Sequence, residues 1–394
     1  MSFATESGPE NVVTIKVVGV GGAGNNVVNR MVKSGTQGIE YVAVNTDKQA
    51  LAVSSADQKI QIGEKLTHGQ GAGSDPDVGK RSAEESRNNI AKSLENADMV
   101  FITAGMGGGT GTGGAPMIAD IAREAGIQTD GVVTKHFKFE GKRRMDQAMV
   151  GINELLGKVD SLLIIPNDRL KFATDQKVTL ANAFEIADDV LRQAVVSISD
   201  LIKNTGFINL DFADVTCVMK DAGFAHMGVG RAAGKGKAED AARMAVASPL
   251  METSINGARG VLINITGSED MGLEDVETAA NLVQEAAHPD ANIIFGASFD
   301  PSLDDEIRVS VIATGFDEPG KAQAEAAPAA AAAPAAAPAA GMYTAAATAA
   351  TAAPAAAPAP AAAPAAPAAA PAADAAAPAE EDPFDSIFKI FNSK

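Results

Sequence analysis

A run of glycines constrains this chain more than any other feature of its sequence. Seven of the ten residues in Gly105–Gly114 are glycine, and the run lies between an apolar stretch typical of a strand, Asp98–Thr103, and a helical pattern, Pro116–Ala125. Ordering so many glycines costs backbone entropy, so a simple turn would not need them. In such a connection several N–H groups can converge on phosphate oxygens at a helix N-terminus, and Thr110 and Thr112 add hydroxyl groups. The run therefore predicts binding of a nucleoside triphosphate, in preference to a flexible hinge.

A second glycine-rich turn, Gly19–Gly24, follows the β-branched stretch Val12–Val20 and precedes a helical pattern at Val27–Val32. It satisfies the G-x-G-x-x-G pattern of dinucleotide-binding folds, and Asp47, after the predicted strand Glu40–Val44, is near where an acid would bind a ribose. This leaves an NAD(P)-dependent oxidoreductase as the alternative. A dinucleotide fold needs only one such turn, whereas a triphosphate gripped from two sides uses two. The pair of turns therefore favours the triphosphate.

The sequence contains no Walker A motif. Ser74–Lys80 and Val229–Lys235 come nearest, and both fail the pattern G-x-x-x-x-G-K-[ST]. No lysine is thus placed to neutralise the β- and γ-phosphates, so Mg²⁺ and backbone dipoles are expected to do more of that work.

Predicted strands and helices alternate through the first half of the chain, which favours a mostly parallel, Rossmann-like sheet with helices on both faces. The strands are Val12–Val20, Glu40–Val44, Asp98–Thr103, Gly131–Thr134 and Ser161–Pro166. The longest helical pattern, Thr179–Lys203, has an apolar stripe of Leu180, Phe184, Ala187, Leu191, Ala194, Ile198 and Ile202. Thr179 can cap its start and Gly206 its end. At 1.5 Å per residue this helix is about 36 Å long, enough to connect two domains.

The chain is expected to divide into five parts. These are a nucleotide-binding domain at 1–178, the connecting helix at 179–206, a smaller α+β C-terminal domain at 207–317, a disordered Ala/Pro linker at 318–379 and a partner-binding peptide at 380–394. The strands predicted in the C-terminal domain are Val215–Met219, Gly260–Thr266, Ala291–Ala297 and Glu306–Thr314.

Composition excludes several classes of function. The net charge of −18 disfavours nucleic acid as a partner, although it permits a single nucleotide. One cysteine, Cys217, allows no intrachain disulfide, and neither a signal peptide nor a transmembrane segment is recognisable, so a cytoplasmic protein is expected. The four histidines, His68, His136, His226 and His288, lack metal-ligand spacing, so no zinc site is predicted.

The C-terminal peptide carries Phe384, Ile387, Phe388 and Phe391 at helical spacing. Asp382 can cap this helix, and Pro383 suits its first position. We expect it to bind a groove on a partner protein, the alternative being an adhesive disordered end. With Lys389 and Lys394 its only basic residues, direct membrane binding is poorly supported.

Asn209, Asp211 and Asp214 follow the long helix closely. Two carboxylates three residues apart can form a metal-binding or water-activating pair. On the residues alone, a polar turn with an N-cap is the favoured interpretation.

Six segments together identify the chain as resembling the tubulin/FtsZ superfamily and, within it, the bacterial FtsZ family. Beside the signature run Gly107–Gly113 these are Gly21–Asn26, Asn45–Asp47, Gly71–Gly73, Phe139–Gly141, Pro166–Leu170 and Asn209–Asp214, in the family's order and spacing. The resemblance extends from about Val12 to Phe316 and so covers the predicted folded part.

The resemblance implies a role for each matching residue. Gly22–Asn26 and Gly109–Gly111 would contact the phosphates, Gly71–Gly73 would close over the γ-phosphate, Glu140 and Arg144 would hold the ribose region, and Asn167 and Asp188 would bind the guanine. The complete implied nucleotide-binding set is Gly21, Gly22, Ala23, Gly24, Asn25, Asn26, Gly71, Ala72, Gly73, Gly105, Met106, Gly107, Gly108, Gly109, Thr110, Gly111, Glu140, Arg144, Asn167 and Asp188.

The resemblance also reverses the interpretation of the carboxylates. Asn209, Asp211 and Asp214 become catalytic residues that reach the nucleotide of the next subunit, where the acids polarise the attacking water. Such a head-to-tail contact does not close, so it builds a filament. The implied protein is an assembly-activated GTPase with GTP or GDP and Mg²⁺ as ligands, which forms the septal ring at mid-cell and binds membrane-tethering and regulatory division proteins through its tail. A passive filament that binds GTP without hydrolysing it is the remaining alternative.

Two segments depart from the family pattern. His136 stands where the family usually carries proline, which is expected to loosen the connection to Glu140. The terminal peptide also differs from the commoner ending built around Asp-Ile-Pro and a basic pair, so the family's tail partners are not carried over.

Overall fold

The computed structural model describes residues 13–36, 38–172, 178–203, 208, 210–251, 255–268, 270–300 and 303–316. Gly206, Asn209, the Ala/Pro linker and the C-terminal peptide with its phenylalanines lie outside these residues.

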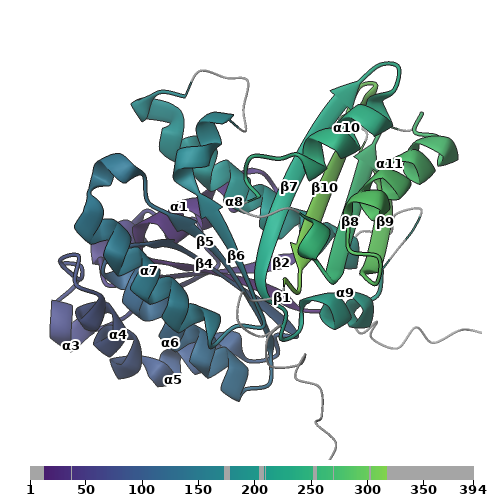
Figure 1. Ribbon diagram of the computed structural model, residues 1–394. Coiled ribbons are helices and arrows are strands. Elements are labelled where there is room, and N and C mark those ends of the chain that lie inside the picture. Colours follow the sequence, from purple (N-terminus) through teal and green to yellow (C-terminus); the bar gives the residue numbers. More distant parts are fainter. Residues whose placement is uncertain are drawn as a thin grey trace, which may run out of the picture. The chain divides into compact units, whose positions relative to one another are not determined.

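The described residues form a ten-stranded sheet in the order β3-β2-β1-β4-β5-β6-β7-β10-β8-β9 (Figure 1). The first six strands along the chain are β1 (Ile15–Val20), β2 (Ile39–Asn45), β3 (Gln58–Gln61), β4 (Met99–Met106), β5 (Gln128–Lys135) and β6 (Ser161–Pro166). All their pairings are parallel. Their alternation with helices confirms the predicted Rossmann-like α/β class, and β3 is a short strand that the sequence analysis missed.

Helices cover both faces of this parallel part. They are α1 (Gly21–Lys33), α2 (Lys48–Ala52), α3 (Glu64–Thr67), α4 (Pro76–Glu85), α5 (Arg87–Leu94), α6 (Thr110–Glu124), α7 (Lys142–Leu156) and α8 (Leu180–Lys203), with short 3₁₀ turns η1 (Lys138–Glu140) and η2 (Asn167–Phe172). Residues of β1 alternate between the two faces, because Ile15 and Val17 join a core with α1 and α8, whereas Val18 and Val20 join a core with α5, α6 and α7.

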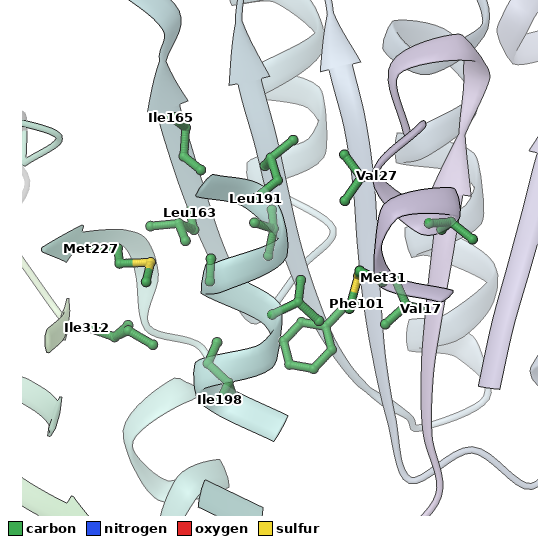
Figure 2. Packing of buried hydrophobic residues seen from close by; sticks show 14 of the residues in the cluster. Val17, Val27, Met31, Phe101, Leu163, Ile165, Leu191, Ile198, Met227 and Ile312 are labelled. Atoms are coloured by element: carbon green, nitrogen blue, oxygen red, sulfur yellow. The ribbon is translucent and has the colours of Figure 1, made fainter. Parts of the chain in front are cut away.

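The long helix α8 confirms the predicted pattern almost to the residue. Leu191 and Ile198 are each 1% exposed and lie between Val17 and Phe101 on one side and Ile312 on the other (Figure 2). At its start, the Asn182 N–H donates to Thr179 Oγ1 over 3.4 Å, so Thr179 caps the helix as predicted. This helix therefore shares one core with both halves of the sheet. Phe184 lies on the predicted stripe but is 45% exposed.

The second half of the sheet mixes directions. It contains β7 (Gly223–Ala233), β8 (Gly260–Gly267), β9 (Asn292–Phe299) and β10 (Glu306–Thr314), with α10 (Lys237–Val246), η3 (Ile255–Gly257) and α11 (Leu273–Ala286) packed on it. β7 pairs in parallel with β6 through Gly223–Ala225 and then antiparallel with β10 from His226 onward. This strand, which the sequence analysis missed, joins the two halves of the sheet.

The prediction of a strand at Val215–Met219 is wrong. Those residues belong to the helix α9 (Phe212–Met219). The Asp214 N–H donates to Asp211 Oδ1 over 2.7 Å, and the Asp211 N–H donates to Asp214 Oδ2 over 3.4 Å. This reciprocal capping box favours a helix over the extended backbone that the β-branched residues suggested.

Candidate functional site

Two helix N-termini lie next to each other at the carboxyl edge of the parallel sheet. α1 begins at Gly21, directly after β1, and α6 begins at Thr110, after β4. The two strands are neighbours, with Val20 paired to Ala104. Neither helix has an acidic residue in its first turn. Because the first N–H groups of a helix lack intrahelical acceptors, this pair of termini favours an anion.

Both predicted glycine-rich segments meet at this place. A Cβ built on Gly21, whose φ is +72°, would lie 3.0 Å from the Gly111 nitrogen. A Cβ on Gly105 would lie 2.7 Å from that of Ala23. The structure thus brings Gly21–Asn26 and the glycine run into direct contact, as the triphosphate interpretation requires.

Most glycines of the run are needed for packing. A Cβ on Gly109 would lie 2.8 Å from the Ala72 Cβ, and one on Gly113 would lie 1.9 Å from the Pro76 oxygen. By contrast, a Cβ on Gly108 or on Gly22 would meet nothing within 4 Å. The number of glycines therefore reflects close backbone contacts as well as a ligand, and Gly22 and Gly108 mark the open side of the site.

The glycines of the segment Gly71–Gly73 also face open space. Gly71 and Gly73 have φ values of +86° and +60°, and a Cβ on either would meet nothing within 4 Å. Ala72, between them, packs against Gly109. This segment is therefore placed beside the glycine run, where the family resemblance expected it.

The polar side chains of the loops have unequal access to a ligand. Thr110 Oγ1 lies 2.7 Å from Thr46 Oγ1. Thr112 is 2% exposed and accepts a 2.8 Å hydrogen bond from the Gly107 N–H, so it supports the loop. Asn25 is buried, and its amide, oriented to satisfy both atoms, donates to the Gly19 and Gly21 oxygens. The expectation that Thr112 adds a hydroxyl for phosphate is thus replaced by a structural role.

His136 connects Glu140 and Arg144 with the glycine run. Arg144 Nη1 is 3.1 Å from Glu140 Oε2, and His136 Nδ1 is 3.0 Å from Glu140 Oε1. A Cβ on Gly107 would lie 2.3 Å from His136 Cδ2, so the imidazole packs against the glycine run. The structure does not bear out a loosened connection, because His136 links the run to both charged residues.

Asn167 and Asp188 have the properties of ligand-binding groups. Asn167 follows β6, is 4% exposed, and its buried Oδ1 has no hydrogen-bond partner within the described residues. A buried unpaired amide oxygen is costly unless a ligand or water satisfies it. Asp188 lies on α8 with Oδ2 3.4 Å from Arg30 Nε, and burial raises its pKa to about 6 despite the opposing effect of Arg30. The packing of η2 on α8 places the two residues on neighbouring elements.

Three aromatic rings form a cluster beside these residues that the sequence analysis missed. Phe137 and Phe139 stack with centroids 5.1 Å apart, and Phe184 meets Phe137 edge-on at 5.5 Å. Phe184 lies one helical turn before Asp188 and is 45% exposed. An exposed ring at this position offers a stacking surface for a planar base. Because Phe184 falls on the apolar stripe of the helix, the sequence analysis assigned it to the core and did not consider it as a ligand-binding residue.

Asp211 and Asp214 follow the end of α8 that lies at the amino edge of the parallel strands. The last residue of α8, Lys203, donates from Nζ to the oxygen of Gly38, directly before β2 begins. β2, β1 and β4 run in parallel, and the glycine run begins at the carboxyl end of β4. Within one chain the structure therefore separates the exposed carboxylates from the glycine run.

The described residues contain no group of three or more His, Cys, Asp or Glu side chains that could hold a metal ion. Among the same residues, no helix is long and apolar enough to cross a membrane.

Comparisons with known proteins agree with this geometry. Residues 14–175 match the Tubulin/FtsZ family, GTPase domain, and residues 223–317 match the FtsZ family, C-terminal domain. The empty FtsZ dimer of M. jannaschii is 44% identical with a TM-score of 0.75, and the match covers 77% of this chain and 88% of that chain. CetZ2 from Haloferax volcanii, solved as a GTPγS-bound protofilament, is 22% identical with a TM-score of 0.65 over 79% of this chain and 96% of that chain, which shows a shared fold. GTP hydrolysis is thus assigned in place of the oxidoreductase that the first glycine turn left open.

Proposed function

The chain belongs to the tubulin/FtsZ family of filament-forming cell-division GTPases, and we propose that two adjacent subunits of a head-to-tail filament complete each of its active sites. The observation that carries this proposal is the separation of the two halves of the site. The phosphate-binding helix termini are at the carboxyl edge of the parallel sheet, whereas Asp211 and Asp214 follow α8, which ends at the amino edge beside Gly38. A nucleotide bound at the carboxyl edge of one subunit therefore meets these acids when a second subunit stacks on that edge with its own amino edge.

GTP or GDP occupies the open space between the two helix N-termini in this proposal. The N–H groups around Gly22 and Gly108 face the phosphates, and Gly71–Gly73 lies beside the γ-phosphate. Glu140 and Arg144 hold the ribose region. The base lies on Phe184, with Asn167 Oδ1 and the Asp188 carboxylate toward its polar edge. An ionised Asp accepts from guanine N1–H and N2–H₂, which explains a preference for GTP.

Hydrolysis requires a water molecule aligned with the γ-phosphate and compensation of the charge that develops on the phosphate oxygens. The dipoles of α1 and α6 supply that compensation from fixed positions. Asp211 and Asp214 of the neighbouring subunit, together with Asn209, polarise the attacking water. Mg²⁺ fits this site as an ion that enters with the nucleotide, because the first turns of α1 and α6 carry no carboxylate and Mg²⁺ is commonly held by substrate phosphates. Bound there, Mg²⁺ neutralises phosphate charge.

The same head-to-tail contact is heterologous and therefore propagates into a filament. We propose that these filaments form the septal ring at mid-cell in the cytoplasm. Residues 380–394 bind membrane-tethering and regulatory division proteins through Phe384, Ile387, Phe388 and Phe391, at the end of the linker formed by 318–379. The division of the folded part into 1–178, 179–206 and 207–317 belongs to the same proposal.

A mixing experiment tests the shared site. Asp211→Ser removes the carboxylate but keeps a residue that caps α9. Gly108→Asp introduces a negative charge in the open space that the phosphates need. Each variant alone should hydrolyse little GTP. In an equimolar mixture, the nucleotide of the first variant meets Asp211 of the second, which restores about a quarter of the wild-type rate if pairing is random.

The dependence of the rate on concentration gives a second readout. The wild-type rate per molecule should rise with protein concentration, and GTP, but not GDP, should drive the protein into a sedimenting fraction. No restoration in the mixture, with a rate per molecule that stays constant from dilute to concentrated protein, would refute the shared site. Sedimentation with GTP that remains unhydrolysed would identify a passive filament.

A further inference from the structure

His136 connects three parts of the nucleotide site that are distant in sequence. It follows β5, and its ring contacts the backbone of Gly107 in the glycine run. Its Nδ1 is 3.0 Å from Glu140 Oε1 in η1, and its Nε2 is 3.1 Å from Arg144 Nε in α7. Glu140 and Arg144 also pair directly, with Oε2 3.1 Å from Nη1. The three side chains therefore form a closed ring of polar contacts.

The partners of the imidazole determine which of its nitrogens carries the proton. The Arg144 guanidinium is always protonated and can only donate, so His136 Nε2 must accept. The proton of the neutral ring is then on Nδ1, where it donates to Glu140 Oε1. The Phe137 N–H donates to the same oxygen over 3.1 Å. Each donor in the contacts among His136, Glu140 and Arg144 faces an acceptor only while His136 is neutral.

Protonation of His136 would break this arrangement. A proton on Nε2 would face the Arg144 Nε–H, so two donors and two positive charges would meet across the 3.1 Å contact. The charged groups that face the imidazole are Glu140 from η1 and Arg144 from α7, and the glycine run contributes only backbone. Glu140 is 8% exposed on its side chain and is held by Phe137 as well, whereas the Arg144 side chain is 44% exposed. Arg144 is therefore the group that would move.

We propose that His136 is a positioning residue of the GTP site, whose neutral Nδ1–H form holds Glu140 and Arg144 in place and whose protonation releases Arg144 and weakens nucleotide binding. This inference rests on the proposed function, because it takes Glu140 and Arg144 as nucleotide-binding residues. Burial lowers the pKa of His136 below its usual range, an effect that Glu140 opposes and Arg144 reinforces. The ring is accordingly neutral near pH 7 and becomes charged only in more acidic solution.

Nucleotide affinity as a function of pH tests the proposal in the full chain. The probe is fluorescent N-methylanthraniloyl-GDP, and the matched variant is His136→Gln, whose side-chain oxygen can accept from Arg144 at every pH. Asp188, whose pKa is raised to about 6, also titrates in acidic solution and affects both proteins, so the ratio of their dissociation constants is compared at each pH. As the pH is lowered from about 7.5 through the protonation of His136, which the histidine resonances described below report, the wild type should lose about tenfold more affinity than His136→Gln, as expected for a hydrogen bond to a charged group.

The outcomes separate this inference from the proposed function. Absence of GDP binding by the wild type near pH 7.5 would overturn both. Normal binding there, with a ratio that stays within roughly twofold across the pH range, would overturn the role of His136 alone.

A spectroscopic measurement on the wild type makes the test independent of how well the variant folds. In the GDP-bound chain labelled with ¹⁵N-histidine, the resonance missing from His136→Gln assigns His136 among the four histidines. If that variant does not fold, His136→Asn serves for the assignment. Near neutral pH the ring should be in the Nδ1–H tautomer, and an Nε2–H tautomer would contradict the proposal.

Discussion

Single glycines of the run have different structural roles. Gly113 allows the backbones of α6 and α4 to touch, since a Cβ there would lie 1.9 Å from the Pro76 oxygen. Gly108 faces open space, and its φ is not positive, so other residues can adopt its backbone conformation. Folding thus requires glycine at 113, whereas the need for glycine at 108 comes from the space required by the ligand.

A pair of alanine substitutions separates these two roles. Gly113→Ala should lower the free energy of unfolding by about 2 kcal/mol or more, because the new methyl group forces the backbones apart. Gly108→Ala should leave that free energy nearly unchanged but weaken GTP binding, because its methyl group occupies the phosphate side of the loop. Urea unfolding and nucleotide titration of both variants measure the two effects. Equal loss of stability in the two variants would contradict the division.

Sequence reasoning recognised the ligand but not the packing. The density of glycines predicted a phosphate site, and both glycine-rich segments do meet at the helix termini. The contacts of Gly109 with Ala72, and of Gly107 with His136, join segments that are far apart along the chain. No local pattern contains such information. Phe184 was missed for a related reason, since helical periodicity predicts the buried face of a helix but not the point at which the partner surface ends.

At the scale of elements, long patterns were predicted well and a short one was not. The apolar stripe and the cap of α8 define its start and length without knowledge of the fold. Val215–Met219 is compatible with a strand or a helix by composition, and the capping box of Asp211 and Asp214 decides between them. Recognition of that box in the sequence would have predicted α9.

Because Asp211 caps α9 as well as being assigned to catalysis, two substitutions are needed to separate its structural role from its catalytic role. Asp211→Ala should lower the free energy of unfolding by about 1 kcal/mol through loss of the N-cap, and it should also abolish GTP turnover. Asp211→Ser should restore the stability, since serine caps helices as well as aspartate, yet remain inactive because it has no carboxylate. Thermal or urea unfolding and phosphate release distinguish the two effects. Turnover by Asp211→Ser at the wild-type rate would show that the carboxylate acts only as a cap.

At the scale of the whole molecule, β7 gives the sheet its continuity. It pairs with β6 and then with β10, so the parallel and mixed parts form one sheet rather than two. The sequence predicted an α/β part and a smaller α+β part joined by a helix, but it missed this strand because glycine and small residues dilute its apolar pattern. The separation of the glycine run from Asp211 follows from the course of α8, whose last residue lies beside Gly38 at the amino edge of the parallel strands, and only the fold reveals that placement.

The stability of the folded part should depend on pH through one buried group in that sheet. Asp130 on β5 is 1% exposed and accepts a 2.5 Å hydrogen bond from Ser161 Oγ, and burial raises its pKa to about 7. In the unfolded chain its pKa is near 3.9. Between about pH 4 and about pH 7 the folded state therefore retains a proton that the unfolded state has lost. The free energy of unfolding then falls as pH rises, by about 1 kcal/mol for each pH unit, and becomes level above this range.

Urea unfolding of the GDP-bound protein should show this slope, and Asp130→Asn, which cannot titrate, should largely remove it. An identical slope in the wild type and in Asp130→Asn would show that Asp130 is already ionised in the folded protein at low pH.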